Sequence, residues 1–265
     1  MTYLHGHHES VLRSHRSRTA ANSAGYLLPV LEPGDRLLDV GSGPGTITAD
    51  LAEIVGPDAT TALEVSAEAL ALTTAELGRR GIAGVTGVVG DVHALPFEDG
   101  SFDVVHAHQV LQHLADPVGA LREMARITAP GGLIAARDSD YGMFTWHPAV
   151  PALTEWLDLY HQLARRQGFE PDAGRYFRAW ANAAGLTDVT ITHSSWTYAT
   201  PDAVAWWSGL WHDRALASEF ATQARAAGVD DATLERIASG WTEWGTSPDA
   251  LFVVPSAELI ARKAA

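Results

Sequence analysis

Three glycines alternate in residues 37–48, LLDVGSGPGTIT, where Gly41, Gly43 and Gly45 follow a short apolar run containing Asp39. A glycine has no Cβ, so its backbone can adopt positive φ and lie close to a ligand. A helix directly after such a loop adds unpaired N–H groups and the positive end of its dipole. A strand, an acid, a glycine loop and a helix in this order predict a ligand-binding loop rather than an ordinary tight turn.

The spacing of the glycines indicates which ligand the loop suits. A dinucleotide-binding loop has the pattern G-x-G-x-x-G, which needs a third glycine where this chain has Thr46. A Walker loop is excluded because no Gly-Lys-Ser/Thr follows. Asp39 would repel a pyrophosphate, whereas its charge suits a ligand that carries an ammonium and a sulfonium group.

The elements around this loop alternate between strand and helix. Strands are expected at residues 36–40, 60–65, 84–90, 101–108 and 132–138, with helical segments at 46–55, 66–81 and 116–132 between them. A leading helix is expected over 9–31, later helices begin near 147, 200 and 231, and two last strands cover 186–200 and 251–264. The pattern predicts an α/β fold with a seven-stranded, mostly parallel Rossmann-like sheet, helices on both faces, an antiparallel final strand pair and a helical insertion over the active site. Ligands of such sheets bind beyond the carboxyl ends of the strands.

Composition excludes several classes of function. The 265 residues carry a net charge of −14, which disfavours a nucleic-acid partner. The absence of cysteine excludes thiolate chemistry and disulfides, and no metal site is predicted. No apolar run is long enough for a membrane span and the first residues lack a signal-peptide layout, so a cytoplasmic protein without a membrane partner is expected, as a monomer or homodimer.

The glycine loop resembles motif I of the class I S-adenosylmethionine-dependent methyltransferases. TALEVS at 61–66, VVGDVHALPFEDGSFDVVHAHQVLQHLADP at 88–117 and REMARITAPGGLIAARD at 122–138 are similar to the later motifs of this family. The resemblance covers about residues 30–140 and is nearest to the ubiquinone/menaquinone and natural-product branch. It implies S-adenosyl-L-methionine as cofactor, S-adenosyl-L-homocysteine as product, a helical lid over 1–30 and a methyltransferase domain over 31–265, with helical cap insertions at about 146–170 and 201–245.

The resemblance also implies a set of cofactor-binding residues. Glu64 would take the ribose hydroxyls, and Asp91 and Val92 would flank the adenine, although Asp91 could instead bond its own turn. The whole predicted set is Asp39, Gly41, Ser42, Gly43, Gly45, Glu64, Val65, Ser66, Gly90, Asp91, Val92, His93, His108 and Gln109.

Catalysis would need a base for the proton of the methyl acceptor. Related natural-product enzymes place a histidine at the position of His113 and pair it with an acid after the fifth strand, here Asp138 or Asp140. A histidine that only packs in the helix is the alternative. The predicted substrate-binding residues are Tyr3, His8, Tyr141, Phe144, Trp146, Trp207 and Trp211. Trp207 and Trp211 lie four apart on one helical face, and Trp206 is expected to point away from their core.

The predicted function is methyl transfer to an oxygen, carbon or nitrogen of a small, aromatic or apolar metabolite of quinone or secondary-metabolite type. An NAD(P)-dependent Rossmann oxidoreductase and a non-catalytic protein that binds S-adenosylmethionine are the alternatives. A nucleic-acid methyltransferase is disfavoured because HAHQ follows the fourth strand in place of a Pro-Pro-aromatic stretch.

Overall fold

The computed structural model describes residues 9–264, with side chains from residue 13 onward. The chain forms two compact units. The sheet unit comprises residues 15–139, 173–194 and the described residues from 256 onward. The helical unit comprises the described residues up to 14, together with 140–172 and 195–255.

Five parallel strands form the core of the sheet unit, in the order β3-β2-β1-β4-β5. They are β1 (Leu37–Val40), β2 (Thr60–Glu64), β3 (Thr86–Val89), β4 (Phe102–His108) and β5 (Thr128–Ser139). All four residues of β1 are buried, as expected for a central strand covered on both faces. The strand order reverses between β1 and β4, which places the glycine loop at the carboxyl edge beside the switch point.

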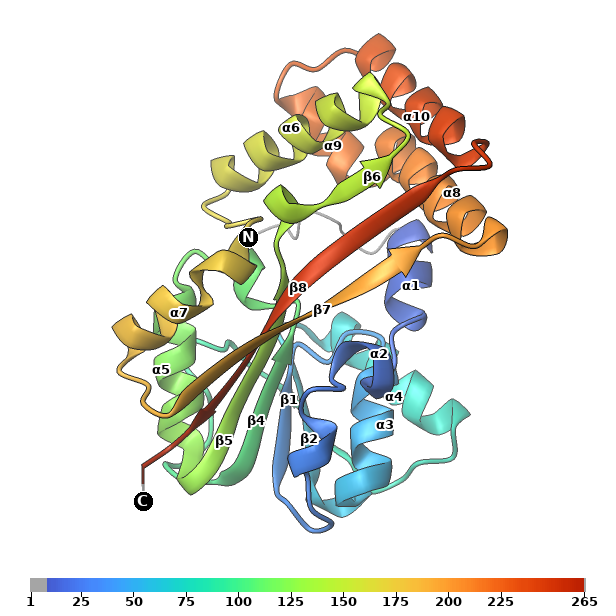
Figure 1. The fold of residues 1–265 in the computed structure, drawn as a ribbon. Coiled ribbons are helices and arrows are strands. Elements are labelled where there is room, and N and C mark those ends of the chain that lie inside the picture. Colours follow the sequence, from blue (N-terminus) through green and yellow to red (C-terminus); the bar gives the residue numbers. More distant parts are fainter. Residues whose placement is uncertain (1–8, 265) are drawn as a thin grey trace. The chain divides into compact units, whose positions relative to one another are not determined.

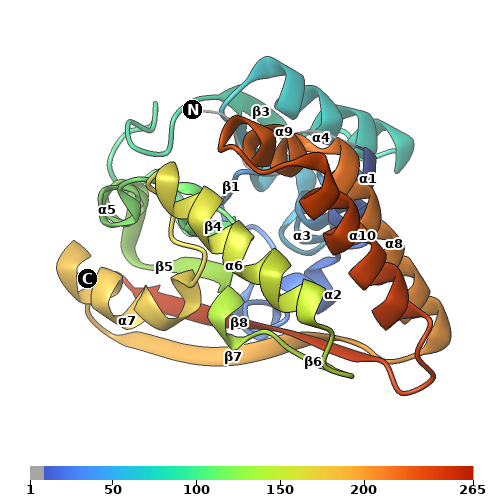
Figure 2. The ribbon, with the colours of Figure 1, turned by 90° about the horizontal axis from the view of Figure 1, so that it is seen from above.

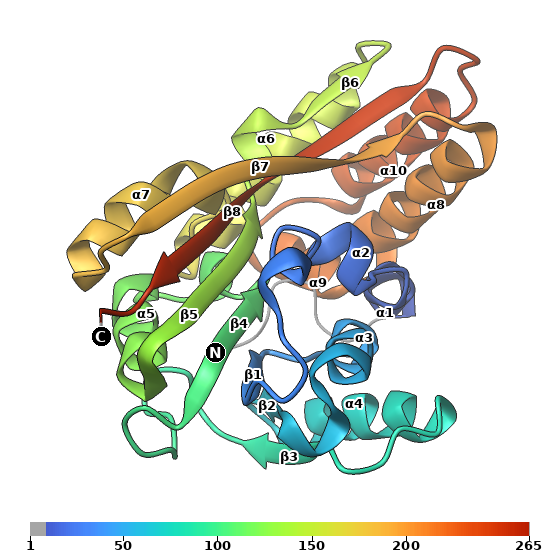
Figure 3. The ribbon, with the colours of Figure 1, turned by 60° about the horizontal axis from the view of Figure 1, so that its bottom comes forward.

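Three further strands complete the sheet. β8 (Leu251–Arg262) runs antiparallel to β5, and β7 (Val189–Tyr198) pairs with β8, as Figure 3 shows. The short β6 (Thr145–His147) pairs with the first residues of β8. The mostly parallel sheet with an antiparallel end is therefore confirmed, with an eighth strand in addition to the seven predicted.

Helices cover both faces of the sheet unit. Figure 1 shows α5 (Pro117–Ile127) and α7 (Ala173–Ala184) on one face and α3 (Thr46–Val55) on the other, with α4 (Ala67–Arg79) beside β2 and β3. Successive residues of β5 point to opposite faces of the sheet. Ile134 packs in the apolar cluster that includes α5, and Ala135 packs in the cluster that includes α3. Helix α5 ends at Ile127, before the predicted Pro-Gly-Gly stop, because β5 begins directly at Thr128.

The prediction of one leading helix over 9–31 is wrong. The segment forms α1 (Glu9–Arg16), α2 (Ala20–Ser23) and a 3-10 turn, η1 (Leu28–Val30). Thr19 starts a new helix, because its side chain accepts the N–H of Asn22 and the Asn22 side chain accepts the N–H of Thr19. Pro29 is the second residue of this last turn, where its missing N–H costs no hydrogen bond.

The helical unit consists mainly of α6 (Pro151–Arg166), α8 (Pro201–Ala217), α9 (Glu219–Ala226) and α10 (Asp231–Gly245). Helices α8 and α10 lie side by side, as Figure 2 shows, and α6 packs against α9 and α10. The continuous helix predicted from residue 200 is interrupted at Ser218, whose hydroxyl caps α9. Among residues 9–264, every helix falls short of the length and apolarity that a bilayer crossing requires.

Candidate active site

The glycine loop joins β1 to α3, and its three glycines have φ values of +71°, +54° and +82° at Gly41, Gly43 and Gly45. A Cβ on Gly45 would lie 2.8 Å from the Cα of Thr73, and one on Gly41 would lie 2.6 Å from Cγ2 of Val110. A Cβ on Gly43 would meet only the Gly41 carbonyl oxygen, at 4.0 Å. Gly41 and Gly45 therefore allow close packing within the protein, whereas Gly43 leaves room for a ligand.

Side-chain hydroxyls fix the conformation of this loop. The hydroxyl of Thr73 in α4 donates to the Gly43 carbonyl at 2.7 Å, so the Ser42 hydroxyl, 2.8 Å away, donates to Thr73. The backbone N–H groups of Gly41 and Ser42 both donate to the Leu63 carbonyl in β2, at 2.8 and 3.2 Å. The loop is thus held by β2 and α4, and the Ser42 hydroxyl is used within the protein.

Glu64 ends β2 and folds back onto the glycine loop. One carboxylate oxygen accepts the Gly43 N–H at 2.6 Å, and the other accepts the Val65 N–H at 3.1 Å. Two backbone donors therefore orient the Glu64 carboxylate, and a carboxylate is the kind of group that accepts paired hydroxyls in a fork. Val65 is 72% exposed and presents apolar surface next to this carboxylate. Together these groups fit a ribose and the base attached to it.

Asp39 is buried and lies beneath the loop rather than on its surface. Its Oδ1 lies 2.8 Å from Nδ1 of His106 in β4, and its Oδ2 accepts the Thr48 hydroxyl at 2.6 Å. Asp39 and His106 are paired residues of the neighbouring strands β1 and β4. The acid therefore links β1, β4 and α3 below the glycine loop.

Asp91 follows β3 and forms the turn that the sequence left open as an alternative. Its Oδ1 accepts the backbone N–H of His93 at 2.9 Å and lies 2.8 Å from Nδ1 of that ring. These two bonds, the backbone one first, lower the pKa of Asp91, whose side chain stays 63% exposed. Val92, next to Asp91, is buried, and the contact of these two residues with adenine stays a prediction. Ser66, also in the predicted set, caps the N-terminus of α4.

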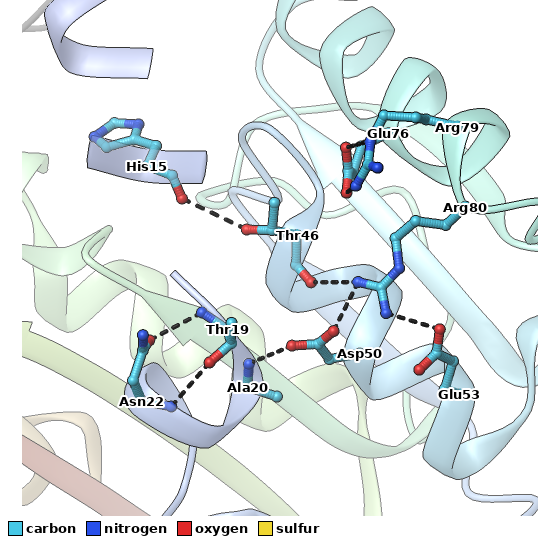
Figure 4. A network of polar contacts seen from close by, with 10 residues as sticks. All are labelled: His15, Thr19, Ala20, Asn22, Thr46, Asp50, Glu53, Glu76, Arg79 and Arg80. Carbon is cyan, nitrogen blue, oxygen red and sulfur yellow. Dashed lines mark hydrogen bonds and ion pairs between the residues drawn. The ribbon is translucent and has the colours of Figure 1, made fainter. Parts of the chain in front are cut away.

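A polar network anchors the segment before β1 to the helix behind the glycine loop (Figure 4). Asp50 of α3 accepts the Ala20 N–H at 2.7 Å and pairs with Arg80, also at 2.7 Å. Arg80 reaches Glu53 at 2.7 Å and the carbonyl of Thr46 at 3.4 Å. Asp50 thereby joins the start of α2 to the end of α4 and steadies the helix whose N-terminus borders the candidate cofactor site.

A chain of amides lies at the carboxyl ends of β4 and β5. Gln109 has φ +57°, donates to the Ser139 hydroxyl at 2.6 Å, and accepts from the Gln112 amide nitrogen at 2.7 Å. The same amide nitrogen lies 3.0 Å from Nε2 of His113. Since an amide nitrogen only donates, Nε2 of His113 accepts and its ring proton sits on Nδ1. Burial, and then the charge of Arg18, lower the pKa of His113 to about 3, so the ring is neutral.

Asp138 lies at the end of β5 and is fully buried. Its Oδ1 accepts the backbone N–H of Gln112 at 3.2 Å, whereas its Oδ2 has no hydrogen-bond partner within the described part of the chain. Burial raises the pKa of Asp138 to about 8. Among the described residues no hydrogen bond joins Asp138 to His113, so the predicted pairing of the two is not seen. Burial also lowers the pKa of nearby His108 well below its ordinary value.

The predicted substrate-binding aromatics lie in the helical unit and form its core. Tyr141 stacks on Phe144 and on Tyr160, and Trp146 stacks on Phe252. Their role toward a substrate stays a prediction. Asp140, also in this unit, is buried at the start of the turn η4 (Tyr141–Met143), and Tyr3 and His8 lie outside the described residues.

The three tryptophans of α8 also pack in this core. Trp207 and Trp211 are buried on one helical face, as predicted. Trp206 is partly buried against the same cluster, so the expectation that it would point away is wrong. A cavity of about 730 Å³ in this unit is lined mainly by α6, with Val229 and Thr233, and by none of these tryptophans.

Sequence reasoning missed three groups of the site, namely Thr73, His106 and Gln112. Thr73 and His106 come from elements that only the tertiary fold brings to the glycine loop. Gln112 directly precedes the histidine that the sequence singled out, but an amide next to a histidine has no recognised pattern.

Comparison with known proteins shows that this chain is similar to methyltransferases. The family described as "Methyltransferase domain" matches residues 38–136. An uncharacterised methyltransferase of Schizosaccharomyces pombe is 31% identical over 272 residues, which cover 98% of this chain and 96% of that protein. A demethylmenaquinone methyltransferase of Renibacterium salmoninarum is 33% identical over 159 residues, which span 58% of this chain and 63% of that enzyme.

A solved structure shares the fold. Phosphoethanolamine N-methyltransferase 2 of Haemonchus contortus, in complex with phosphomonomethylethanolamine and S-adenosylhomocysteine, superposes with a TM-score of 0.56 at 19% identity. The superposition covers 90% of this chain and 51% of that one.

Proposed function

From the premise that this chain belongs to the class I S-adenosylmethionine-dependent methyltransferases and uses S-adenosylmethionine as its cofactor, we propose that it methylates a small aromatic metabolite of quinol type. The match to a demethylmenaquinone methyltransferase supports this acceptor class. The acceptor is a hydroxylated ring, whose methylated atom is an oxygen or a ring carbon. A nitrogen acceptor is the less supported form of the same proposal.

The geometry of the glycine loop and Glu64 supports the cofactor site most directly. Gly43 leaves open space above the loop, and the Glu64 carboxylate is oriented by the Gly43 and Val65 N–H groups toward that loop. In the proposed complex Glu64 accepts the ribose hydroxyls, Val65 packs on the adenine, and the N-terminus of α3 lies next to the carboxylate of the amino acid part. When bound, the cofactor supplies a methyl group on a positively charged sulfur, which is a good leaving group.

The chain itself positions the reactants for an in-line transfer. The carboxyl ends of β4 and β5 carry His108, Gln109 and Asp138, at the edge where parallel sheets bind ligands. Holding nucleophile, methyl carbon and sulfur in line can lower the barrier by about 7–11 kcal/mol. The cytoplasmic location and the monomeric or dimeric state stay predictions.

Two measurements test this function. Isothermal titration with S-adenosylhomocysteine and with NADH should give saturable binding of the first and none of the second. Transfer of a labelled methyl group from S-adenosylmethionine to 1,4-dihydroxynaphthalene, read by mass spectrometry, tests the acceptor class. Binding of NADH instead would contradict the family assignment, and cofactor binding with no methylated product would contradict the acceptor.

A further inference from the structure

Two buried side-chain oxygens, one at the end of β5 and one in the turn after β4, have no hydrogen-bond partner among residues 9–264. They are Oδ2 of Asp138 and Oε1 of Gln112, in side chains that are 0% and 2% exposed. The Gln112 backbone N–H donates to Oδ1 of Asp138 at 3.2 Å, so the two residues are direct neighbours. A buried acceptor left unsatisfied costs about 1–3 kcal/mol, and such groups in a folded protein call for an explanation such as a ligand. A partner for Oε1 of Gln112, and for Oδ2 of Asp138 in its charged form, carries O–H or N–H donors.

His113, the residue that the sequence favours as the base, is already committed to another role. Its Nε2 accepts the Gln112 amide N–H at 3.0 Å. The lone pair that would take a proton is therefore occupied, and the remaining ring nitrogen carries the ring proton. The Gln112 amide nitrogen donates to both Gln109 and His113, so Oε1 of Gln112 points away from these two residues.

We propose that Asp138 is the base that takes the hydroxyl proton of the methyl acceptor, while Oε1 of Gln112 accepts a hydrogen bond from a second hydroxyl of the same molecule. This inference rests on the proposed function and identifies its acceptor as a dihydroxylated aromatic ring. The O–H bond breaks and its proton passes to Oδ2 of Asp138. The oxygen's electron pair forms the new bond to the methyl carbon as the carbon–sulfur bond breaks. The two electrons of the carbon–sulfur bond stay on sulfur. The proton leaves Asp138 for solvent after the products depart.

The surroundings of Asp138 suit this task. Burial raises its pKa to about 8, and this outweighs the opposing effect of two backbone N–H groups and of the charges of Arg137 and Arg18. Tyr26, whose own pKa burial raises, is a further titratable group close enough to interact with Asp138. A phenolic hydroxyl has a pKa of about 10, so transfer to a carboxylate with a pKa near 8 is only modestly uphill.

The test compares Asp138→Asn with His113→Asn and Gln112→Met, using 1,4-dihydroxynaphthalene as acceptor. Asp138→Asn should lower kcat by about 10²–10⁴-fold, the usual contribution of a general base, while affinity for S-adenosylhomocysteine changes less than threefold. His113→Asn should lower kcat less than tenfold. Gln112→Met should raise KM for the dihydroxy acceptor more than for 1-naphthol, which lacks the second hydroxyl. Equal losses in the first two variants, or Asp138→Asn within tenfold of wild type, would overturn the proposal.

A second measurement needs no turnover. Carbon-13 NMR of the side-chain carboxyl groups, in the complex with S-adenosylhomocysteine, should show one resonance that titrates near pH 8 and is absent from Asp138→Asn. A midpoint below pH 5 would overturn the proposal even if the ring is methylated. If Asp138 titrates near pH 8 but no naphthol is methylated, the buried proton of Asp138 is confirmed, whereas the dihydroxylated acceptor of this proposal is wrong.

Discussion

Asp138→Asn should change how the stability of this protein depends on pH. Burial raises the pKa of Asp138 from its ordinary 3.8 to about 8. Between these values the folded state keeps a proton that the unfolded state has released. Folding stability therefore falls by about 1.36 kcal/mol for each unit of rising pH, and the fall ends above the folded pKa. Over pH 5 to 8 the wild type loses about 4 kcal/mol through this one group.

Asparagine carries no such proton, so the variant lacks this slope. Its amide nitrogen replaces Oδ2, and leaving that donor unsatisfied costs about 1–3 kcal/mol at every pH. The variant should be less stable than wild type by about 1–3 kcal/mol at pH 5, and more stable by about 1–3 kcal/mol at pH 8. The change in the difference, about 4 kcal/mol, does not depend on the amide cost.

Urea unfolding of both proteins at pH 5, 6, 7 and 8 measures this difference directly. Asp91→Asn is the matched control, because Asp91 is exposed and its pKa is lowered, so any stabilisation it gives is lost only as the pH falls through that low pKa. Free energies of unfolding that stay parallel for wild type and Asp138→Asn, within about 1 kcal/mol over this range, would refute the buried proton.

Three other changes test the cofactor site. Gly43→Ala should abolish binding of S-adenosylhomocysteine by calorimetry while costing only about 1–2 kcal/mol of stability, and Gly81→Ala, also at positive φ in open space, should leave binding intact. Glu64→Gln should weaken this binding by about ten- to hundredfold, since hydrogen bonds to a charged group contribute about 1.5–3 kcal/mol; an unchanged affinity would exclude Glu64 from the ribose. Asp50→Asn should weaken the binding of S-adenosylhomocysteine several-fold, because it loosens α2 and α4 from α3. Glu53→Gln removes only the more exposed pair with Arg80 and should leave this binding unchanged. Equal effects of the two variants in calorimetry would contradict the anchoring role of Asp50.

Much of the fold is predictable because local signals agree with it. Ser66 and Asp116 cap α4 and α5 as their positions in the sequence indicate, and Pro117 begins α5. The breaks at Thr19 and Ser218 were missed because no glycine or proline marks them, and only the cap bonds reveal a new helix start. The strand β6 is three residues long and is created by its pairing with β8, which no local pattern announces.

The candidate site is predictable where backbone geometry decides it and not where tertiary neighbours do. The glycine spacing marks the loop, but only Thr73 and Val110, brought from elsewhere, show that Gly43 alone faces open space. The sequence also favours His113 as the base on residue type. In the structure, Nε2 of His113 accepts the Gln112 amide N–H, and Oδ2 of Asp138 is buried without a hydrogen-bond partner in the described part of the chain. Residue types alone do not reveal either feature.

The most direct test of the cofactor site is a crystal structure of this protein with S-adenosylhomocysteine. We expect both ribose hydroxyls within about 2.6–3.0 Å of the two carboxylate oxygens of Glu64, with the amino acid part passing over Gly43. A nucleoside bound away from Glu64, or a ribose held by other groups while Glu64 bonds only to the protein backbone, would contradict the account.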